Sequence, residues 1–154
     1  MRMSLLIPGI IIIVVAVAGI IFFGFQGRSA LRKARVLVAG KTIQVEVAET
    51  VLSRAQGLSG RDGLDSDSGM LFIFTSPGKN GFWMKDMKFP IDMVWISGDR
   101  VLGVTENVQP EPEKSIFRLT VHYPPDPVDK VLELPAGAAK AYGIASGTIL
   151  SIEN

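Results

Sequence analysis

Six polar or aromatic side chains in the middle of the chain are of types that bind small molecules or transfer protons. A pair of carboxylates can act as general acid and general base, as the paired acids of glycoside hydrolases do. Cationic and aromatic side chains can hold a sugar, a peptide end or a small anion. The six candidate ligand-binding residues are Arg54, Arg61, Trp83, Lys85, Asp92 and Glu106.

Three of these residues lie close together in GFWMKDMKFPIDMVWIS, residues 81–97, which holds both tryptophans of the chain. The pattern predicts two strands, 82–87 and 92–97, that form a hairpin. Pro90 lies between them, and because proline lacks the amide that a strand centre requires, it indicates a bend. The hairpin is expected to present aromatic and charged side chains together.

Two interpretations of these charges remain open. In the first, Lys85 or Lys88 comes near Asp92 to form a polar cleft with an aromatic floor, which suits a small polar ligand. In the second, Asp92 caps or pins the turn after Pro90, Arg54 satisfies a nearby carbonyl or carboxylate, and the tryptophans belong to the core.

Several other kinds of site are excluded or disfavoured by composition. The chain has no cysteine and a single histidine, His122, in a proline-rich loop. Disulfides, thiolate metal sites, cysteine nucleophiles and multi-histidine zinc sites are therefore impossible. The segment DSDSG, 65–69, resembles the start of a calcium loop but lacks its closing glutamate, since Ser76 occupies that position. We expect no metal and no cofactor.

The N-terminus carries an apolar segment, LLIPGIIIIVVAVAGIIFFGF, residues 5–25, without a charged residue. As a helix it would span the roughly 30 Å hydrocarbon core of a bilayer. It predicts a transmembrane anchor over residues 1–27, followed by a basic linker over 28–35. A signal peptide cleaved after Ala18 is the alternative, although the apolar stretch is long for one.

The remaining part, residues 36–154, is large enough for one domain with its own core. From Val36 onward the chain has 11 Lys and Arg against 15 Asp and Glu, a net charge near −4. A negative domain is a poor partner for phosphate backbones, so we expect no nucleic acid. The basic residues are concentrated in the first 35 positions.

Strand signals dominate residues 36–154. Residues 36–48 read as a hairpin turning at Ala39-Gly40, and MLFIF, 70–74, reads as a strand covered on both faces. Short helices are expected near 50–57 and 135–143. With about eight short strands, the pattern favours an α+β or mainly-β class: a compact, barrel-like antiparallel domain with about two short helices.

A long loop, residues 109–127, separates the last strands and holds five of the nine prolines. A loop of this length inside a compact domain is functional or mobile. One short strand within it, FRLTV at 117–121, fits the pattern.

Four segments follow one another over roughly residues 36–153: RAQGLSGRDGL, GMLFIF, FWMKDMKFPIDMVWIS and VLELPAGAAKAYGIASGTIL. In sequence, order and spacing they resemble the domain of unknown function 192 family, also called uncharacterised protein family 0127. The resemblance implies a compact β-rich domain, often behind a signal peptide or anchor, with no established reaction. Relatives often carry cysteines in the segment matching 109–127, and this chain has none, so any disulfide-linked role there is in doubt.

Localisation and function follow as expectations. The basic residues after 5–25 favour a cytoplasmic domain by the positive-inside rule, whereas the family's habit of export favours an extracytoplasmic one, which we adopt. We expect a single-pass membrane protein whose domain is a non-catalytic binding or accessory module for a small polar ligand or a membrane protein partner. The alternatives are a small hydrolase that uses Asp92 and Glu106, and a purely structural or interaction domain of a membrane complex.

Overall fold

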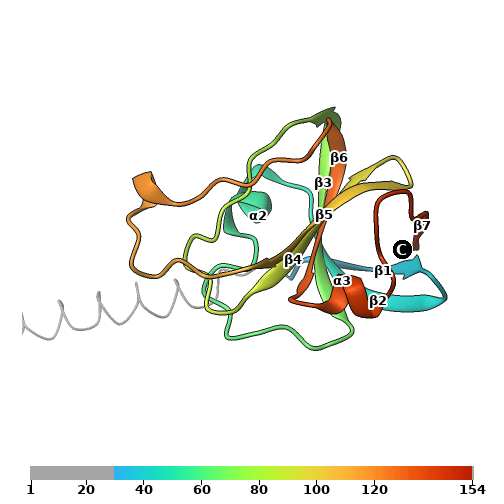
Figure 1. The fold of residues 1–154 in the computed structure, drawn as a ribbon, viewed down its shortest axis with the longest axis horizontal. Helices are drawn as coiled ribbons and strands as arrows, with labels where there is room; N and C mark the ends of the chain where they lie inside the picture. The colour runs from blue at the N-terminus through green and yellow to red at the C-terminus, as the bar shows by residue number, and fades with distance from the viewer. Residues whose placement is uncertain (1–29, 154) are drawn as a thin grey trace, which may run out of the picture. The chain divides into compact units, whose positions relative to one another are not determined.

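The computed structural model describes residues 30–153, which form one curved seven-stranded sheet with short helices beside it (Figure 1). The mainly-β class with two short α-helices is confirmed. The strands are β1 (Arg32–Val38), β2 (Lys41–Ala48), β3 (Ser68–Gly78), β4 (Ile91–Ser97), β5 (Arg100–Val108), β6 (Val128–Pro135) and β7 (Leu150–Glu153). The helices are α2 (Val51–Gln56), the 3-10 helix η1 (Ile116–Arg118) and α3 (Ala138–Ala141).

The strand order is β5-β4-β6-β3-β2-β1-β7, and the sheet curls into a half-barrel. The two outer strands meet at one end, where Arg100 pairs with Ile149 in an isolated antiparallel bridge. The sheet is antiparallel, as expected, at every strand pairing except that of β2 and β3, which run parallel. A parallel pair requires a crossover, and the segment that contains α2 returns the chain to the same end of the sheet.

The predicted hairpin at Ala39-Gly40 is confirmed as β1 and β2. Both turn residues have positive φ, 48° and 74°, as a two-residue hairpin turn with the right twist requires. Along β2, Ile43, Val45 and Val47 are buried and alternate with more exposed positions. The sequence pattern therefore gave the orientation of this strand correctly.

The domain begins earlier than its sequence pattern indicates. Strand β1 starts at Arg32, so four residues of the predicted 28–35 linker lie in the sheet. Arg32 and Arg35 point outward, where they form ion pairs with Glu49 and Glu153. The basic residues made this segment look like a linker, although their side chains lie on the solvent-exposed face of a strand.

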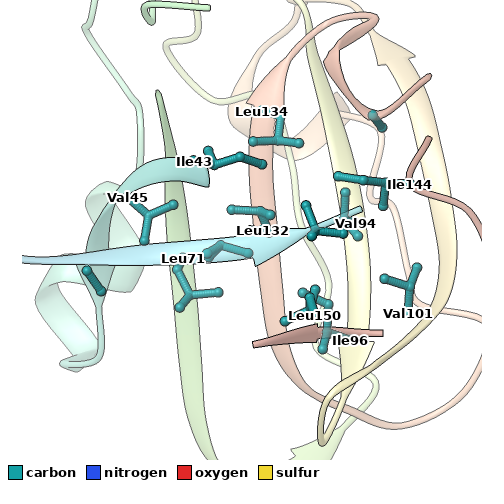
Figure 2. Packing of buried hydrophobic residues seen from close by; sticks show 14 of the residues in the cluster. Ile43, Val45, Leu71, Val94, Ile96, Val101, Leu132, Leu134, Ile144 and Leu150 are labelled. Atoms are coloured by element: carbon teal, nitrogen blue, oxygen red, sulfur yellow. The ribbon is translucent and has the colours of Figure 1, made fainter. Parts of the chain in front are cut away.

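The inside of the half-barrel is an aliphatic core to which every strand contributes. Figure 2 shows its side chains converging from strands far apart in the sequence, with Leu71 on β3, Val94 on β4 and Leu132 on β6. Ala139 of α3 and Ile144 close one end. Burying this many methyl and methylene groups is the main stabilising contribution to the fold.

A second core lies on the opposite face of β3, β4 and β6. It contains aromatic and sulfur-containing side chains, among them Phe72, Phe82, Met93 and Trp95. Strand β3 is thus covered on both faces, as the unbroken apolar run 70–74 predicts. This second face carries the pocket described below.

The predicted strand 82–87, and with it the hairpin of 81–97, is wrong. Within this segment Phe82 forms only an isolated bridge to His122, and the chain then turns, with the Met87 amide bonded to the Met84 carbonyl. Asp86 has a left-handed φ of 54°, which a regular strand does not accommodate. Met84 and Met87 are buried because this loop packs against the second core.

The long loop after β5 contains η1 where a strand was expected at 117–121, and it extends away from the sheet (Figure 1). Glu111 holds it together: its carboxylate accepts hydrogen bonds from the Thr120 amide at 2.8 Å and the Thr120 hydroxyl at 2.7 Å, and it pairs with Lys114. These bonds, led by that from Lys114, lower the pKa of Glu111 to about 2.

The predicted anchor, residues 5–25, lies outside the described residues. Within residues 30–153, no helix has the length and apolar character needed to cross a bilayer.

Candidate functional site

A pocket of about 260 Å³ opens on the second face of the sheet. Helix α2 and the turn after it form one wall, β3 contributes aromatic rings, and residues 80–83 form the opposite wall. The lining side chains that carry the argument are Arg54, Phe72, Phe74, Phe82, Trp83 and Glu133.

Glu133 is the buried acid of this pocket. It lies on β6 in register with Met70 and Met93, between Leu132 and Leu134, whose side chains enter the aliphatic core. Strand alternation therefore directs Glu133 toward the aromatic face. Its side chain is 5% exposed, and it makes no hydrogen bond or ion pair with any other residue in 30–153.

This environment changes the acid's protonation. Burial away from water disfavours the charged form and raises the pKa of Glu133 from 4.5 to about 8. At neutral pH the carboxyl is therefore mostly protonated and uncharged. A carboxyl with an unpaired donor and acceptor, in contact with a pocket, can bond to whatever enters.

Aromatic side chains line the same pocket as this acid. The ring of Phe82 makes edge-to-face contacts with Phe72, Phe74 and Trp95, at centroid distances of 5.0, 6.3 and 5.6 Å. Trp83 is the next residue along the chain, lines the same pocket and is 48% exposed, so part of its side chain is accessible to a ligand. The pocket lining thus combines aromatic surface with one acid, Glu133, and one cation, Arg54, and a mostly apolar lining with a few polar groups is usual for a small-molecule site.

Arg54 fixes the helix wall. The capping box between Thr50 and Ser53 starts α2, and Arg54 lies in its last turn. Its Nη1 donates to the carbonyl of Glu49 at 2.7 Å and to the carbonyl of Ile73 at 2.9 Å. Its guanidinium also lies 5.2 Å from the ring centroid of Phe74. The arginine therefore ties α2 to β3 beside the pocket.

The opposite wall depends on a close approach at Gly81. A Cβ there would lie 2.6 Å from Cγ1 of Val121 and 3.0 Å from the ring of Tyr123. The next residue, Phe82, exchanges two backbone hydrogen bonds with His122, at 2.9 and 2.7 Å. The end of the long loop thus packs closely against the pocket wall, and a side chain at position 81 would require Val121 or Tyr123 to shift.

The predicted site residues divide into two groups. Arg54 and Trp83 both line the pocket. Arg61 pairs with Glu46 beside a separate, more polar hollow, and Lys85 pairs with its neighbour Asp86 on the surface. Glu106 is exposed on β5. The structure does not gather the six candidates into one cleft.

Asp92 is fully buried, with 0% exposure, and both oxygens of its carboxylate are occupied. Oδ1 accepts a 2.8 Å hydrogen bond from the amide of Asn107, and Oδ2 accepts a 3.0 Å bond from the amide of Ala139. Asn107 has a left-handed φ of 52° at an irregular point of the β4–β5 pairing. Asp92 therefore links β4 both to the irregular segment of β5 at Asn107 and to the first turn of α3.

Glu133 was missed by the sequence interpretation. Its signal was an acid within the apolar run KVLEL, residues 130–134, at a position that strand alternation places on a face. An acid at such a position is ordinary in a strand that has one solvent-exposed face. It is unusual here because both faces of β6 are buried. Among residues 30–153, no three acidic or histidine side chains gather in a way that could hold a metal ion.

Comparison with known proteins places the chain in a family. The model of the DUF192 family, described as an uncharacterized ACR, matches residues 34–152. The chain is similar to a solved structure of a candidate transcription regulator from Sinorhizobium meliloti 1021, with 34% identity and a TM-score of 0.72 over 81% of this chain and 97% of that one. It is also similar to a protein of unknown function from Novosphingobium aromaticivorans DSM 12444, with 27% identity and a TM-score of 0.69 over 82% and 89%. No curated protein matches. The chain belongs to the DUF192 family.

Proposed function

We propose that the domain is a non-catalytic binding module whose small ligand occupies the pocket between α2 and residues 80–83. One observation carries this proposal: Glu133 is buried in the pocket among aromatic rings and has no partner within residues 30–153. Because the carboxyl lines the pocket, it is available to bond to a small molecule that enters there.

The pocket's size supports a small ligand. Its volume of about 260 Å³ lies just below the range of about 300–1,000 Å³ for sites that hold drug-sized molecules, which points to a smaller ligand. The walls are held in place before anything binds, since Arg54 ties α2 to β3 and the Phe82–His122 bridge holds the opposite wall. A preformed site loses little entropy when it binds its ligand.

The S. meliloti relative raises the question of DNA binding. From Val36 onward, acids outnumber bases by 15 to 11 in this chain, which opposes contact with a phosphate backbone. The ligand pocket is the better supported function.

The hydrolase alternative is less well supported. An acid–base pair needs carboxyl oxygens that can reach a substrate. Both oxygens of Asp92 are bonded to backbone amides, and Glu106 is exposed on β5. These contacts support a structural role for Asp92.

The membrane location is part of the same proposal. Residues 5–25 would tether the domain, and its pocket would face the extracytoplasmic side. Protease treatment of intact cells tests the orientation, because an extracytoplasmic domain is digested without lysis and a cytoplasmic one is not.

A thermal-shift screen of the full-length chain tests the pocket. The panel consists of sugars, amines, amino acids, nucleotides and organic anions, each at concentrations up to saturation. A ligand at about 100 times its dissociation constant adds roughly 2.7 kcal/mol to stability, which raises the melting temperature measurably. We expect at least one class to stabilise the wild type and not Trp83→Ala.

The matched control is Phe117→Ala, which removes an aromatic side chain that is 96% exposed and does not line the pocket. It should retain the ligand response. Binding that Phe117→Ala removes and Trp83→Ala preserves would overturn the assignment of this pocket.

A further inference from the structure

Building on the proposed binding function, we infer that the ligand presents an organic ammonium group to Glu133 and the aromatic rings around it. The inference combines three features of the pocket: an acid without a partner among the described residues, several aromatic side chains in the lining, and a second charge that is already held in place.

The acid gives the pocket its charge preference. An organic cation buried away from water needs a counter-ion, and a carboxylate is the group that supplies one. Glu133 meets this requirement because it is 5% exposed, lines the pocket and has no other partner among the described residues. A ligand anion would gain no counter-ion from this acid.

The rings complete a cation site. The faces of aromatic rings carry negative potential and attract ammonium groups, with tryptophan the strongest partner. Trp83, Phe72 and Phe82 line the same pocket as Glu133, and Trp83 is half exposed. Aromatic residues around a carboxylate are the chemistry that recognises quaternary and primary ammonium groups.

Arg54 is the other charged residue that lines the pocket within residues 30–153. It faces Phe74 and is held there by two backbone carbonyls, so its charge is already partly compensated. Its repulsion disfavours a ligand cation beside the Phe74 ring.

Binding of a cation must displace a proton. In the free protein near neutral pH the Glu133 carboxyl is protonated, because burial raises its pKa to about 8. Pairing with an ammonium ion requires the carboxylate, so the O–H bond breaks and one proton leaves to solvent for each cation bound. The dissociation constant should therefore fall about tenfold per pH unit up to pH 8 and then level off.

Titration calorimetry of the full-length chain with choline and ethanolamine tests the inference. The neutral isostere 3,3-dimethylbutan-1-ol has the shape of choline without its charge. We expect one or both cations to bind at least tenfold more tightly than the isostere, more tightly at pH 8 than at pH 6. Glu133→Gln should weaken binding at least a hundredfold, and Trp83→Ala at least tenfold, whereas the exposed-acid control Glu106→Gln should leave it unchanged.

Other outcomes separate the two proposals. Equal binding of choline and the isostere, or affinity that falls as pH rises, would overturn the ammonium inference. A sugar or anion that binds in a Trp83-dependent way, while both cations fail, would overturn it and leave the pocket's binding function standing. If no compound of either set binds, both proposals fail.

Discussion

The Asp92 carboxylate and the Ala139 amide are joined by a 3.0 Å hydrogen bond that connects β4 to the first turn of α3. The other oxygen of Asp92 holds the amide of Asn107, whose φ is positive. Asp92→Asn replaces one acceptor oxygen with an NH₂ group that faces an amide donor. We expect the free energy of unfolding to fall by about 2 kcal/mol, measured by urea denaturation.

Glu106→Gln is the matched control for this substitution. It makes the same change of acid to amide on the neighbouring strand β5, at an exposed position. Its stability should stay within about 0.5 kcal/mol of the wild type. Equal stability of Asp92→Asn and the wild type would show that the two amide bonds do not stabilise the fold.

Glu133 should make stability depend on pH in an unusual direction. An acid whose pKa is raised by folding, here from 4.5 to about 8, holds its proton more tightly in the folded state. The contribution of the protonated carboxyl to the free energy of unfolding is complete below pH 4.5 and is lost as the pH rises through about 8. The slope reaches about 1.4 kcal/mol per pH unit in this window.

The variant Glu133→Gln removes this dependence. Relative to the wild type, it should gain stability steadily between pH 5 and pH 8, as measured by urea denaturation at each pH. Parallel curves for the two proteins across this range would mean that Glu133 titrates normally and is accessible to water.

The close packing of Gly81 against the long loop predicts that a larger residue there lowers both stability and ligand binding. Gly81→Ala places a methyl group 2.6 Å from Cγ1 of Val121, so the loop end must move. We expect a loss of about 1–3 kcal/mol in stability and weaker binding of any pocket ligand. Gly63→Ala is the control, because a Cβ at Gly63 meets nothing within 4 Å. A similar response of both variants would argue against the close packing at Gly81.

Glu111 should control the order of the long loop at acidic pH. Its pKa is lowered by folding from 4.5 to about 2, chiefly by the hydrogen bond from Lys114 and then by Thr120. The ionised Glu111 carboxylate therefore stabilises the folded loop above pH 4.5, and this stabilisation is lost as the pH falls through about 2. Hydrogen exchange of the Thr120 amide should therefore lose protection toward pH 2, and Glu111→Gln should show weaker protection already at pH 6. Unchanged protection in the variant would contradict this role.

The sequence predicted those elements whose patterns are local. The β1–β2 hairpin has a two-residue turn and clear alternation, and β3 has an unbroken apolar run, so both were found. The prediction of a strand before Pro90 was wrong because the apolar residues there follow a strand-like pattern but belong to a loop that packs against the second core. The parallel pairing of β2 and β3 depends on where the crossover returns the chain, which short-range patterns do not encode.

The site was only half predictable for the same reason. Arg54 and Trp83 were identified from residue type, and both line the pocket. Glu133 was not, because its burial depends on neighbours from distant parts of the chain, among them Met70 on β3 and Met93 on β4, which lie in register with it. Asp92 was identified as important, and its second interpretation, a buried acid that pins the fold, is the one its contacts favour.

The two tryptophans of the chain allow the most direct test of the pocket. Trp83 lines it, whereas Trp95 is 1% exposed and donates its indole Nε1–H to Thr105 at 2.9 Å. Fluorine NMR of the full-length chain labelled with 5-fluorotryptophan should give two signals, which Trp83→Phe assigns. Titration with choline should move the Trp83 signal saturably and leave the Trp95 signal nearly still, and Glu133→Gln should abolish the shift. If the Trp83 signal stays fixed with choline and with every other compound of the panel, the pocket is not a binding site.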